Sequence, residues 1–317
     1  MDVIFMGTPV WASFYLDAII NAGGRIPLVI TQPDRPRGRS RTPKPPPVKQ
    51  KALEMGLEVH QPENINTPES LARLQQAEPD LFVVVAFGQI LGDEILEVPA
   101  VDALNVHYSL LPELRGPAPV QYALMRGYDK TGVTLQKMAS EVDAGDIYAQ
   151  REVRIEDDDN ADTLCRKLTG LGVQMLKETL PKIHAGQLQP TPQDHGETTY
   201  APMITKADRA LDFSRPAEDI RNRIRALAPR PAAYCFVSGR RLKVIEAEVG
   251  KKFTEVEGKP GEIVEMDNSR GPEIKTGRGT LVLTRVQPAG SREMDAVDWL
   301  RGARLQPGVM LSGCVDK

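Results

Sequence analysis

The apolar positions in the first half of the chain form short continuous runs separated by stretches with helical period. The runs Val3–Met6 and Pro27–Thr31 predict the first two strands. The run Leu81–Phe87 does not alternate with polar residues, which is typical of a strand buried on both faces of a parallel sheet. A helical pattern follows the first run, Val48–Gly56 predicts a second helix, and Thr67 is placed to cap a third. Strands that alternate with helices in this way predict an α/β domain.

The pattern changes after a long amphipathic helix that we predict over Ala161–His184. Residues 186 to about 208 are rich in proline, glycine and polar side chains, as linkers are. Beyond them we expect a helix at Ala217–Leu227 and a helical turn at Ala296–Leu300, with several short strands between them that suggest a small OB-like β-barrel. These strands are expected at Ala233–Val237, Leu242–Glu248, Gly261–Glu265 and Thr280–Val286.

A chain of 317 residues is long for a single core. We predict a first domain at residues 1–188, a linker at 189–208 and a second domain at 209–317. The net charge of −3 is unevenly spread, because residues 209–317 carry five more basic than acidic side chains and the remainder carries eight more acidic than basic ones. A basic C-terminal part favours a polyanionic partner.

Composition excludes several classes of protein. The content of 41% hydrophobic and 26% charged residues is ordinary for a globular protein. Cys165, Cys235 and Cys314 are widely spaced, which predicts a reducing compartment and neither a disulfide framework nor a zinc site. No apolar run is long enough to span a bilayer and no signal-peptide pattern opens the chain, so we expect a cytoplasmic protein. The acidic run at 157–159 precedes a helix, where carboxylates more often complement the helix dipole than bind a metal.

The candidate chemistry lies in the stretch Leu104–Pro119. Asn105 and His107 are two residues apart in a predicted strand, so they project from the same face where the strand gives way to a loop. Ligands of open α/β sheets bind beyond the carboxyl ends of the strands. An amide that donates a hydrogen bond, beside an imidazole that can give or take a proton, suits a reaction in which a carbonyl oxygen becomes an oxyanion.

A lone histidine on a strand is more often a hydrogen-bonded structural residue than a catalyst, and the pair alone leaves both interpretations open. Asp143 favours the catalytic one. It lies in a glycine-containing turn after another predicted strand, Val133–Met138, where its carboxylate could orient the imidazole as the third group of a triad does.

An unusual basic insertion occupies residues 32–51. It holds seven basic residues, one acidic residue and six prolines, and the prolines, all of which precede the helix predicted from Val48, predict neither helix nor sheet pairing. Many charge runs are only solvated surface loops. However, strand-to-helix connections in such folds ordinarily take ~2–6 residues, so the length and charge of this one favour phosphate contact. Its basic residues are Arg35, Arg37, Arg39, Arg41, Lys44, Lys49 and Lys51.

Together these motifs resemble the folate-dependent formyltransferases, and among them the members that act on charged tRNA. The resemblance runs almost from end to end and implies a Rossmann-like formyltransferase domain followed by an OB-like β-barrel domain that binds tRNA. One departure is visible, because Arg230 stands between two prolines where many members place an aromatic residue. The motifs are Gly7-Thr8-Pro9, Asn105-x-His107, Ser109-Leu110-Leu111-Pro112, Gly116-x-x-Pro119 and Asp143 in an Asp-x-Gly-Asp turn.

The resemblance implies transfer of the formyl group of 10-formyltetrahydrofolate, released as tetrahydrofolate, to the α-amino group of methionyl-initiator tRNA. In this hypothesis Asn105 donates to the oxyanion, protonated His107 stabilises it and handles protons, and Asp143 orients His107 and helps to move the amine proton. The implied cofactor-binding residues are Phe87, Gly88, Gln89, Ile90, Leu91, Ser109, Leu110, Leu111 and Pro112, and the implied tRNA-binding residues are Arg35, Arg37, Arg39 and Arg41.

Two alternatives stay open. A small-molecule folate-dependent N-formyltransferase, acting on an amino sugar or on glycinamide ribonucleotide, would share the Asn/His/Asp set and would not need the basic insertion. A non-catalytic RNA-binding protein on the same scaffold would need the insertion and not the set. We expect a monomer with no membrane or metal partner.

Overall fold

The computed structural model describes residues 1–36, 42–250, 256–267, 269–303 and 305–314, which form two compact units. The N-terminal unit comprises Met1–Pro119, Lys130–Arg154 and Cys165–Pro202, and the C-terminal unit comprises Val120–Asp129, Ile155–Leu164 and Met203–Lys317. Two short segments from early in the chain therefore group with the C-terminal unit. The domain boundaries expected at 188 and 208 stay a prediction.

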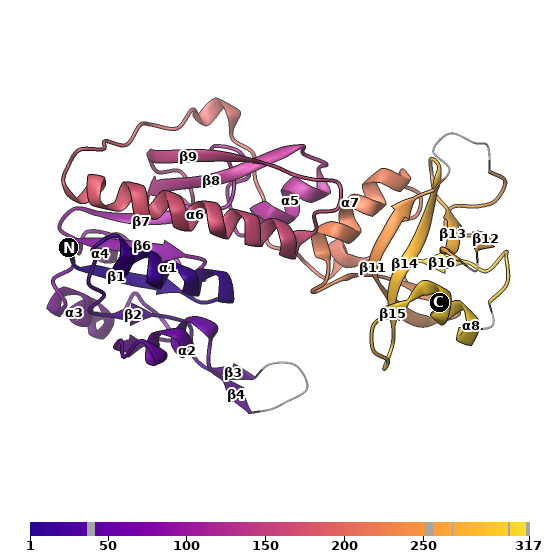
Figure 1. Ribbon diagram of the computed structural model, residues 1–317, viewed down its shortest axis with the longest axis horizontal. Coiled ribbons are helices and arrows are strands. Elements are labelled where there is room, and N and C mark those ends of the chain that lie inside the picture. The colour runs from indigo at the N-terminus through magenta and orange to yellow at the C-terminus, as the bar shows by residue number, and fades with distance from the viewer. Residues whose placement is uncertain (37–41, 251–255, 268, 304, 315–317) are drawn as a thin grey trace. The chain divides into compact units, whose positions relative to one another are not determined.

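A seven-stranded sheet forms the centre of the N-terminal unit, with the order β5-β2-β1-β6-β7-β8-β9 (Figure 1). The first five strands in this order are parallel, and β8 and β9 are antiparallel to their neighbours. The continuous apolar runs are buried on both faces, which confirms the predicted α/β fold. The strands are β1 Val3–Gly7, β2 Val29–Ile30, β5 Val59–His60, β6 Leu81–Val85, β7 Asp102–His107, β8 Lys130–Lys137 and β9 Ile147–Arg154.

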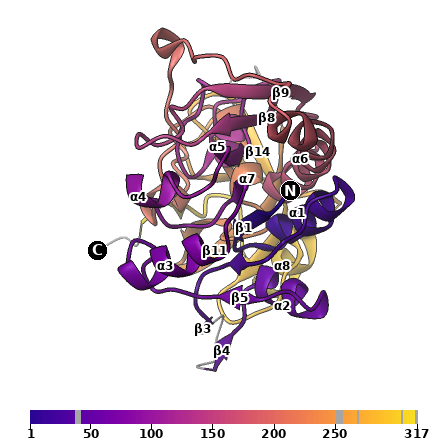
Figure 2. The same ribbon diagram turned by 90° about the vertical axis from the view of Figure 1, so that its left-hand side faces the viewer.

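Helices cover both faces of this sheet (Figure 2). On one side lie α1 (Val10–Asn21), α2 (Pro47–Glu54) and α6 (Ala161–His184), and on the other lie α3 (Pro68–Gln76) and α4 (Asp93–Leu96). The Thr67 hydroxyl accepts a hydrogen bond from the Ser70 amide at 3.2 Å, so Thr67 caps α3 as expected. Alternate strand residues such as Ile4, Met6, Phe82 and Val84 form the core beneath α3 and α4.

The strand order places the carboxyl ends of β1, β6 and β7 at one edge of the sheet. The order reverses between β1 and β6, which is the switch point where ligands bind in such sheets. The loops after these two strands touch there, because the Thr8 hydroxyl donates to the Phe87 carbonyl at 2.8 Å. The next strand in the order, β7, carries Asn105 and His107, so the candidate chemistry lies at the same edge.

The prediction that the basic insertion forms no sheet pairing is wrong. Residues Arg35–Pro36 (β3) and Pro43–Lys44 (β4) pair as a two-stranded antiparallel ribbon, with Arg35 opposite Lys44 and Pro36 opposite Pro43. Hydrogen-bonded and non-hydrogen-bonded pairs alternate in such a ladder, so two facing prolines can occupy a pair that needs no N–H donor. Residues 37–41 between the two strands lie outside the described residues.

The C-terminal unit is a curled antiparallel sheet of order β12-β13-β14-β11-β10-β16, with β15 paired to β14, which confirms the expected OB-like domain. Its core lies between the sheet and the helices α7 (Ala217–Leu227) and α8 (Ala296–Ala303), where Ile220, Ile224 and Trp299 are buried. Another helix, α5 (Pro119–Met125), begins in the N-terminal unit. The pattern missed β13, which opens with glycine and proline, and the two-residue strands β15 and β16. The strands are β10 Ala233–Val237, β11 Arg240–Val249, β12 Ile263–Asp267, β13 Gly271–Lys275, β14 Thr280–Pro288, β15 Met294–Asp295 and β16 Leu311–Ser312.

Candidate active site

The pairing of β7 with β8 sets the polar floor of the candidate site. Asn105 lies directly opposite Gln136, and His107 lies directly opposite Thr134. Opposed residues of an antiparallel pair share a face of the sheet, so all four side chains project the same way. Gln136 was missed by the sequence analysis, and the register opposite Asn105 is the signal that could have found it.

The turn after β8 brings Asp143 back over these side chains. Asp143 has a φ of +54°, a left-handed conformation uncommon outside glycine. Its Oδ1 accepts hydrogen bonds from Asn105 Nδ2 at 3.1 Å and Gln136 Nε2 at 2.8 Å, and its Oδ2 accepts one from the Gly116 amide at 2.8 Å. His107 Nδ1 lies 3.5 Å from the same Oδ1. The structure therefore brings together the three side chains predicted to be catalytic.

The environment of His107 defines its protons. The side chain is only 6% exposed, and its Nε2 lies 3.0 Å from the Leu114 carbonyl. Because a carbonyl can only accept, Nε2 carries a proton, and a second proton on Nδ1 would form an ion pair with Asp143. Any hydrogen bond from Nε2 to a substrate must therefore replace the one to Leu114. Asn105, in contrast, has a second amide hydrogen to which no residue in the described part of the chain is bonded.

The Ser109–Pro112 stretch is anchored to the sheet by its backbone. The Thr134 hydroxyl donates to the Ser109 carbonyl at 2.7 Å and accepts from the Leu111 amide at 3.1 Å, and Gln150 Nε2 donates to the Leu111 carbonyl at 2.7 Å. The side chains of Ser109 and Leu111 are buried, while Leu110 is partly exposed. These bonds hold the loop in one conformation beside His107.

The Phe87–Leu91 loop offers backbone and apolar surface at the switch point. Phe87 and Leu91 are buried in the core, and the side chain of Gln89 is bonded to the backbone of neighbouring loop residues. Gly88 has a φ of +88°, and Ile90 is 69% exposed. Bare backbone beside an exposed apolar side chain fits a flat heteroaromatic ring that has an amide edge.

The predicted tRNA contacts can be located only in part. Arg35 is exposed, and its guanidinium lies 3.7 Å from the Glu63 carboxylate, while Lys49 pairs with Asp34 at 2.9 Å. Arg37, Arg39 and Arg41 lie outside the described residues.

In the C-terminal unit the arginines of α7 stabilise the fold. Arg221 lies 3.8 Å from the Asp157 carboxylate, Arg223 donates to the Asp208 carbonyl at 2.7 Å, and Arg225 donates to the Asn222 side chain at 2.9 Å. They are therefore engaged within the protein.

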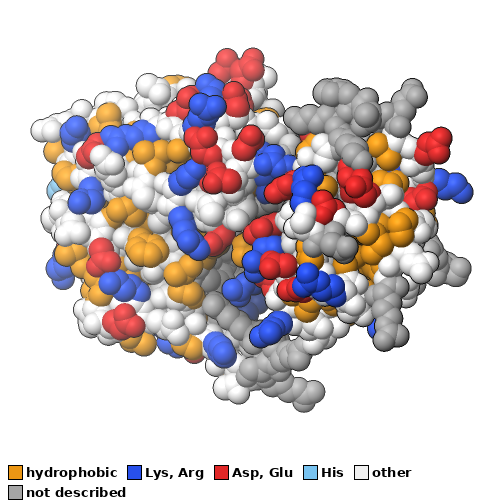
Figure 3. Space-filling model, turned by 45° about the vertical axis from the view of Figure 1, so that its right-hand side comes forward, with side chains coloured by type: hydrophobic (Ala, Val, Ile, Leu, Met, Phe, Trp, Pro, Cys, Tyr) orange, Lys and Arg blue, Asp and Glu red, His pale blue; other side chains and the backbone are white. Residues whose placement is uncertain are grey.

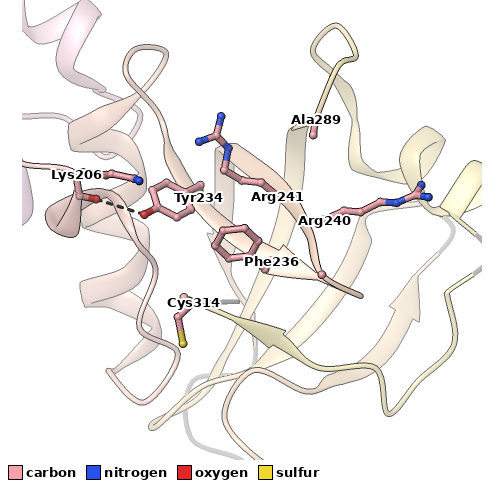
Figure 4. Close-up of a pocket in the computed structure, with 9 residues that line it drawn as sticks. Lys206, Tyr234, Phe236, Arg240, Arg241, Ala289 and Cys314 are labelled. Atoms are coloured by element: carbon pink, nitrogen blue, oxygen red, sulfur yellow. Dashed lines mark hydrogen bonds between the residues drawn. The ribbon is translucent and has the colours of Figure 1, made fainter. Parts of the chain in front are cut away.

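Three other cations, Lys206, Arg240 and Arg241, line a surface hollow at β10 and β11 (Figure 4). The guanidiniums of Arg209 and Arg241 lie 5.8 and 5.7 Å from the centre of the Tyr234 ring, which packs edge to face against Phe236. Burial, and then the charges of neighbouring arginines, lower the pKa of Lys243. No carboxylate in the described part of the chain pairs with this β10–β11 basic cluster, whose members are Lys206, Arg209, Arg230, Arg240, Arg241 and Lys243.

On the face of the molecule that Figure 3 presents, basic and acidic side chains are mixed. Asp159, in the acidic run, accepts hydrogen bonds from the Glu156 amide at 2.8 Å and the Thr163 hydroxyl at 2.9 Å, so it closes the turn that precedes α6. Among the residues that the structure describes, no cluster of three or more His, Cys, Asp or Glu side chains could hold a metal ion. Within the same residues, no helix is both long and apolar enough to cross a membrane.

Two family models cover most of the chain. Formyl transferase matches residues 1–180, and Formyl transferase, C-terminal domain, matches residues 203–304. Methionyl-tRNA formyltransferase from Bacillus licheniformis is 44% identical over 310 residues, which cover 98% of this chain and 97% of the relative. The protein of that name from Sulfurihydrogenibium sp. is 43% identical over 309 residues, which cover 97% of this chain and 99% of the relative.

Solved structures with the same fold are more distant. The sugar 3N-formyl transferase WlaRD, with dTDP and 5-N-formyl-THF, aligns with a TM-score of 0.66 at 18% identity, over 92% of this chain and 99% of that one. HypX from Aquifex aeolicus, in complex with tetrahydrofolic acid, aligns with a TM-score of 0.62 at 20% identity, over 94% of this chain and 46% of that longer one. At these identities the likeness shows the fold alone. The full-length similarity to the curated relatives shows that the chain belongs to the formyl transferase family.

Proposed function

We propose that this protein transfers the formyl group of 10-formyltetrahydrofolate to the α-amino group of methionyl-initiator tRNA, for translation initiation. The observation that carries the proposal is the match, from end to end, to curated relatives named methionyl-tRNA formyltransferase. The convergence of Asn105 and His107 on the Asp143 carboxylate supports the chemistry. The likeness to sugar N-formyltransferases, at 18% identity, does not favour the small-molecule alternative.

The proposed roles follow from what each of the three side chains can donate or accept. Asn105 uses its second amide hydrogen to donate to the formyl oxygen as that oxygen gains negative charge. His107 stabilises the same charge with the Nε2 proton that otherwise bonds to Leu114. Asp143 holds the imidazole in orientation and helps to remove the proton of the attacking amine.

The cofactor supplies an activated formyl group: the bond from the formyl carbon to N10 breaks as the bond to the methionyl nitrogen forms, and N10 takes up the proton that the amine gives up, so that the cofactor leaves as tetrahydrofolate. We place its pterin ring against the Phe87–Leu91 loop, where exposed Ile90 and the uncovered backbone at Gly88 fit a flat ring. The Ser109–Pro112 loop then contacts the rest of the cofactor. Its anchoring to Thr134 and Gln150 supports this, because a fixed loop is preorganised for binding.

Two basic surfaces are proposed to hold the tRNA. One is the insertion at residues 32–51, with Arg35, Arg37, Arg39 and Arg41. The other is the β10–β11 basic cluster, whose charges lack carboxylate partners in the described part of the chain. Arg209 donates to the carbonyls of Ala232 and Pro231, so the charges proposed to be available to phosphates are those of the other members. A protein with this substrate works where translation occurs, so we propose a cytoplasmic location and retain the expectation of a monomer.

A formylation assay tests the proposal directly. Purified protein is incubated with 10-formyltetrahydrofolate and methionyl-initiator tRNA, beside uncharged initiator tRNA, methionyl-elongator tRNA and amino-sugar nucleotides. We expect formylmethionyl-tRNA to form only with the charged initiator. Formylation of a sugar or a ribonucleotide without formylation of the tRNA would contradict the proposal, and so would the absence of formylation of any amine.

The insertion is tested by Arg39→Ala and Arg41→Ala. Each change removes a candidate phosphate contact, so we expect slower formylation of methionyl-tRNA at subsaturating tRNA, by roughly tenfold for a contact worth ~1.4 kcal/mol. Arg25→Ala is the control, because Arg25 is an exposed arginine whose charge is already paired with Asp2. Rates equal to wild type in both loop variants would count against a role for the insertion.

A further inference from the structure

The chain returns along the N-terminal unit after α6, through residues 190–201. This return segment makes a two-way backbone bridge between Thr191 and Ile147, at 2.8 and 2.9 Å, close to the start of β9 (Figure 1). Further along, the Arg115 amide donates to the Thr199 carbonyl at 2.9 Å, and the Ala201 amide donates to the Arg115 carbonyl at 2.7 Å. The segment that the sequence predicts as a linker therefore lies against both loops of the candidate site.

Gln193 is the residue of this segment that reaches the Asp143 turn. Its side chain is only 6% exposed, and its Nε2 donates to the carbonyls of Asp143 at 2.9 Å and Gly145 at 2.7 Å. The turn has little room to shift, because a Cβ on Gly145 would lie 1.9 Å from the Lys137 carbonyl oxygen. One amide group thus holds the backbone on both sides of the turn that presents the carboxylate.

The other end of the same amide is bound to the His107 loop. Gln193 Oε1 accepts hydrogen bonds from Arg115 Nη2 at 2.7 Å and Nε at 3.2 Å. Arg115 is 2% exposed and lies between Leu114, whose carbonyl accepts from His107, and Gly116, whose amide donates to the Asp143 carboxylate. The Gln193 amide therefore connects the loop that holds the imidazole with the turn that holds the carboxylate.

We propose that Gln193 is a positioning residue for the catalytic Asp143 and His107, which it acts on by clamping their two loops together through Arg115. This inference rests on the proposed function of those two residues. A side-chain amide is suited to the task because it donates at one end and accepts at the other, with both ends buried and satisfied. The clamp also keeps Asp143 in its left-handed backbone conformation, which an aspartate does not favour by itself.

Replacing the amide tests the clamp. Gln193→Met keeps the approximate length of the side chain and removes both the hydrogen-bond donor and the acceptor. Gln193→Glu keeps the acceptor for Arg115 but replaces the donor to the two carbonyls with an oxygen, which cannot donate to them. We expect kcat for formyl transfer to fall by roughly 10- to 100-fold in both variants, because small displacements of catalytic groups cost rates of this order. The KM values for tRNA and for the folate should stay within about twofold of wild type, since Gln193 is proposed to touch neither. Gln189→Met is the matched control, because Gln189 lies just before the return segment and, among the described residues, its side chain bonds to the Gly186 carbonyl alone.

A second measurement reads the geometry without turnover. Hydrogen exchange of the Gly116 amide, which is bonded to Asp143, should be faster in both Gln193 variants than in wild type, while the thermal midpoint of each variant shows that it is folded. Wild-type kcat in folded Gln193→Met would overturn the inference, as would an equal loss of kcat in Gln189→Met or a change confined to KM. If wild type itself does not formylate methionyl-tRNA, the proposed function fails, and unchanged Gly116 exchange in the variants would still overturn the clamp on its own.

Discussion

The side chains of Asn105 and His107 on β7 and of Gln136 on β8 meet at the Asp143 carboxylate. The two-residue spacing of Asn105 and His107 on a strand puts the amide and the imidazole side by side, as predicted. The contribution of Gln136 became visible only with the register of β7 and β8, and that of Gln193 only with the course of the return segment. No periodicity marks a glutamine in a proline-rich stretch as part of a site.

At the residue scale, Asn105→Ala and His107→Ala should each lower kcat for formyl transfer by at least ~100-fold. Losing an oxyanion donor typically costs ~10²–10³ in rate, and a positioned acid–base group contributes ~10²–10⁴. The measurement is single-turnover formylation with saturating substrates. His184→Ala is the control for the loss of an imidazole. His184 is the last residue of α6 and lies 3.4 Å from the Asp80 carboxylate, so it also has a carboxylate neighbour but is not part of the candidate site. Near-normal turnover in either variant would exclude the role proposed for that residue.

At the scale of elements, helix α6 matches its predicted bounds, Ala161–His184, because a long 3.6-residue period is the strongest local signal. The ribbon of β3 and β4 shows the opposite case. Proline content predicts unpaired chain, but among the described residues β3 and β4 form a sheet of only two strands, which needs few N–H donors. Arg35 and Lys44, which have N–H groups, lie opposite each other and the two prolines face each other.

Two glycines of α6 should respond oppositely to the same change. A Cβ on Gly172 would lie 2.1 Å from the Tyr15 hydroxyl, in a fully buried side chain that is bonded to Tyr108. Overpacking costs ~1–3 kcal/mol, which exceeds the gain in helix propensity of ~1 kcal/mol, so we expect Gly172→Ala to lower the free energy of unfolding.

A Cβ on Gly170 meets no atom within 4 Å, so the propensity gain stands alone. We expect Gly170→Ala to raise the free energy of unfolding by ~0.5–1 kcal/mol. Urea denaturation of both variants beside wild type gives the comparison. If both substitutions shift stability in the same direction, the packing of α6 against Tyr15 is not as described.

At the scale of the whole molecule, a net charge of −3 conceals an excess of five basic over acidic side chains in residues 209–317. The arginines of α7 are engaged by nearby acceptors, whereas the β10–β11 basic cluster has no carboxylate partners among the described residues. A count of charged residues in the sequence cannot distinguish the arginines of α7 from the β10–β11 basic cluster. Only the contacts separate charges that stabilise the fold from charges that are available to a polyanion.

The β10–β11 basic cluster is tested by the salt dependence of tRNA binding. Removing a cation that neutralises a phosphate should weaken binding and reduce the slope of log K against log[salt] by about 0.7–0.9 per contact. We expect this in Arg240→Ala and Arg241→Ala, measured by filter binding at several salt concentrations. Arg301→Ala serves as the control, since Arg301 is already paired with Asp298 at 3.0 Å. Identical slopes in all three variants and wild type would exclude the cluster from the tRNA contact.

The sequence by itself determined the buried parallel strands, the long helix and the OB-like second part, and it proposed Asn105, His107 and Asp143 as the candidate catalytic residues. It could do so because periodicity, strand spacing and turn residues act over a few positions and are written directly in the order of amino acids. Only the tertiary structure decided which polar groups support them, because the contacts of Gln193 with Asp143 and of Arg115 with Gln193 join residues 50 and 78 positions apart. It also decided which cations among the described residues have a carboxylate partner, since a charge is neutralised by neighbours in space and not by neighbours along the chain.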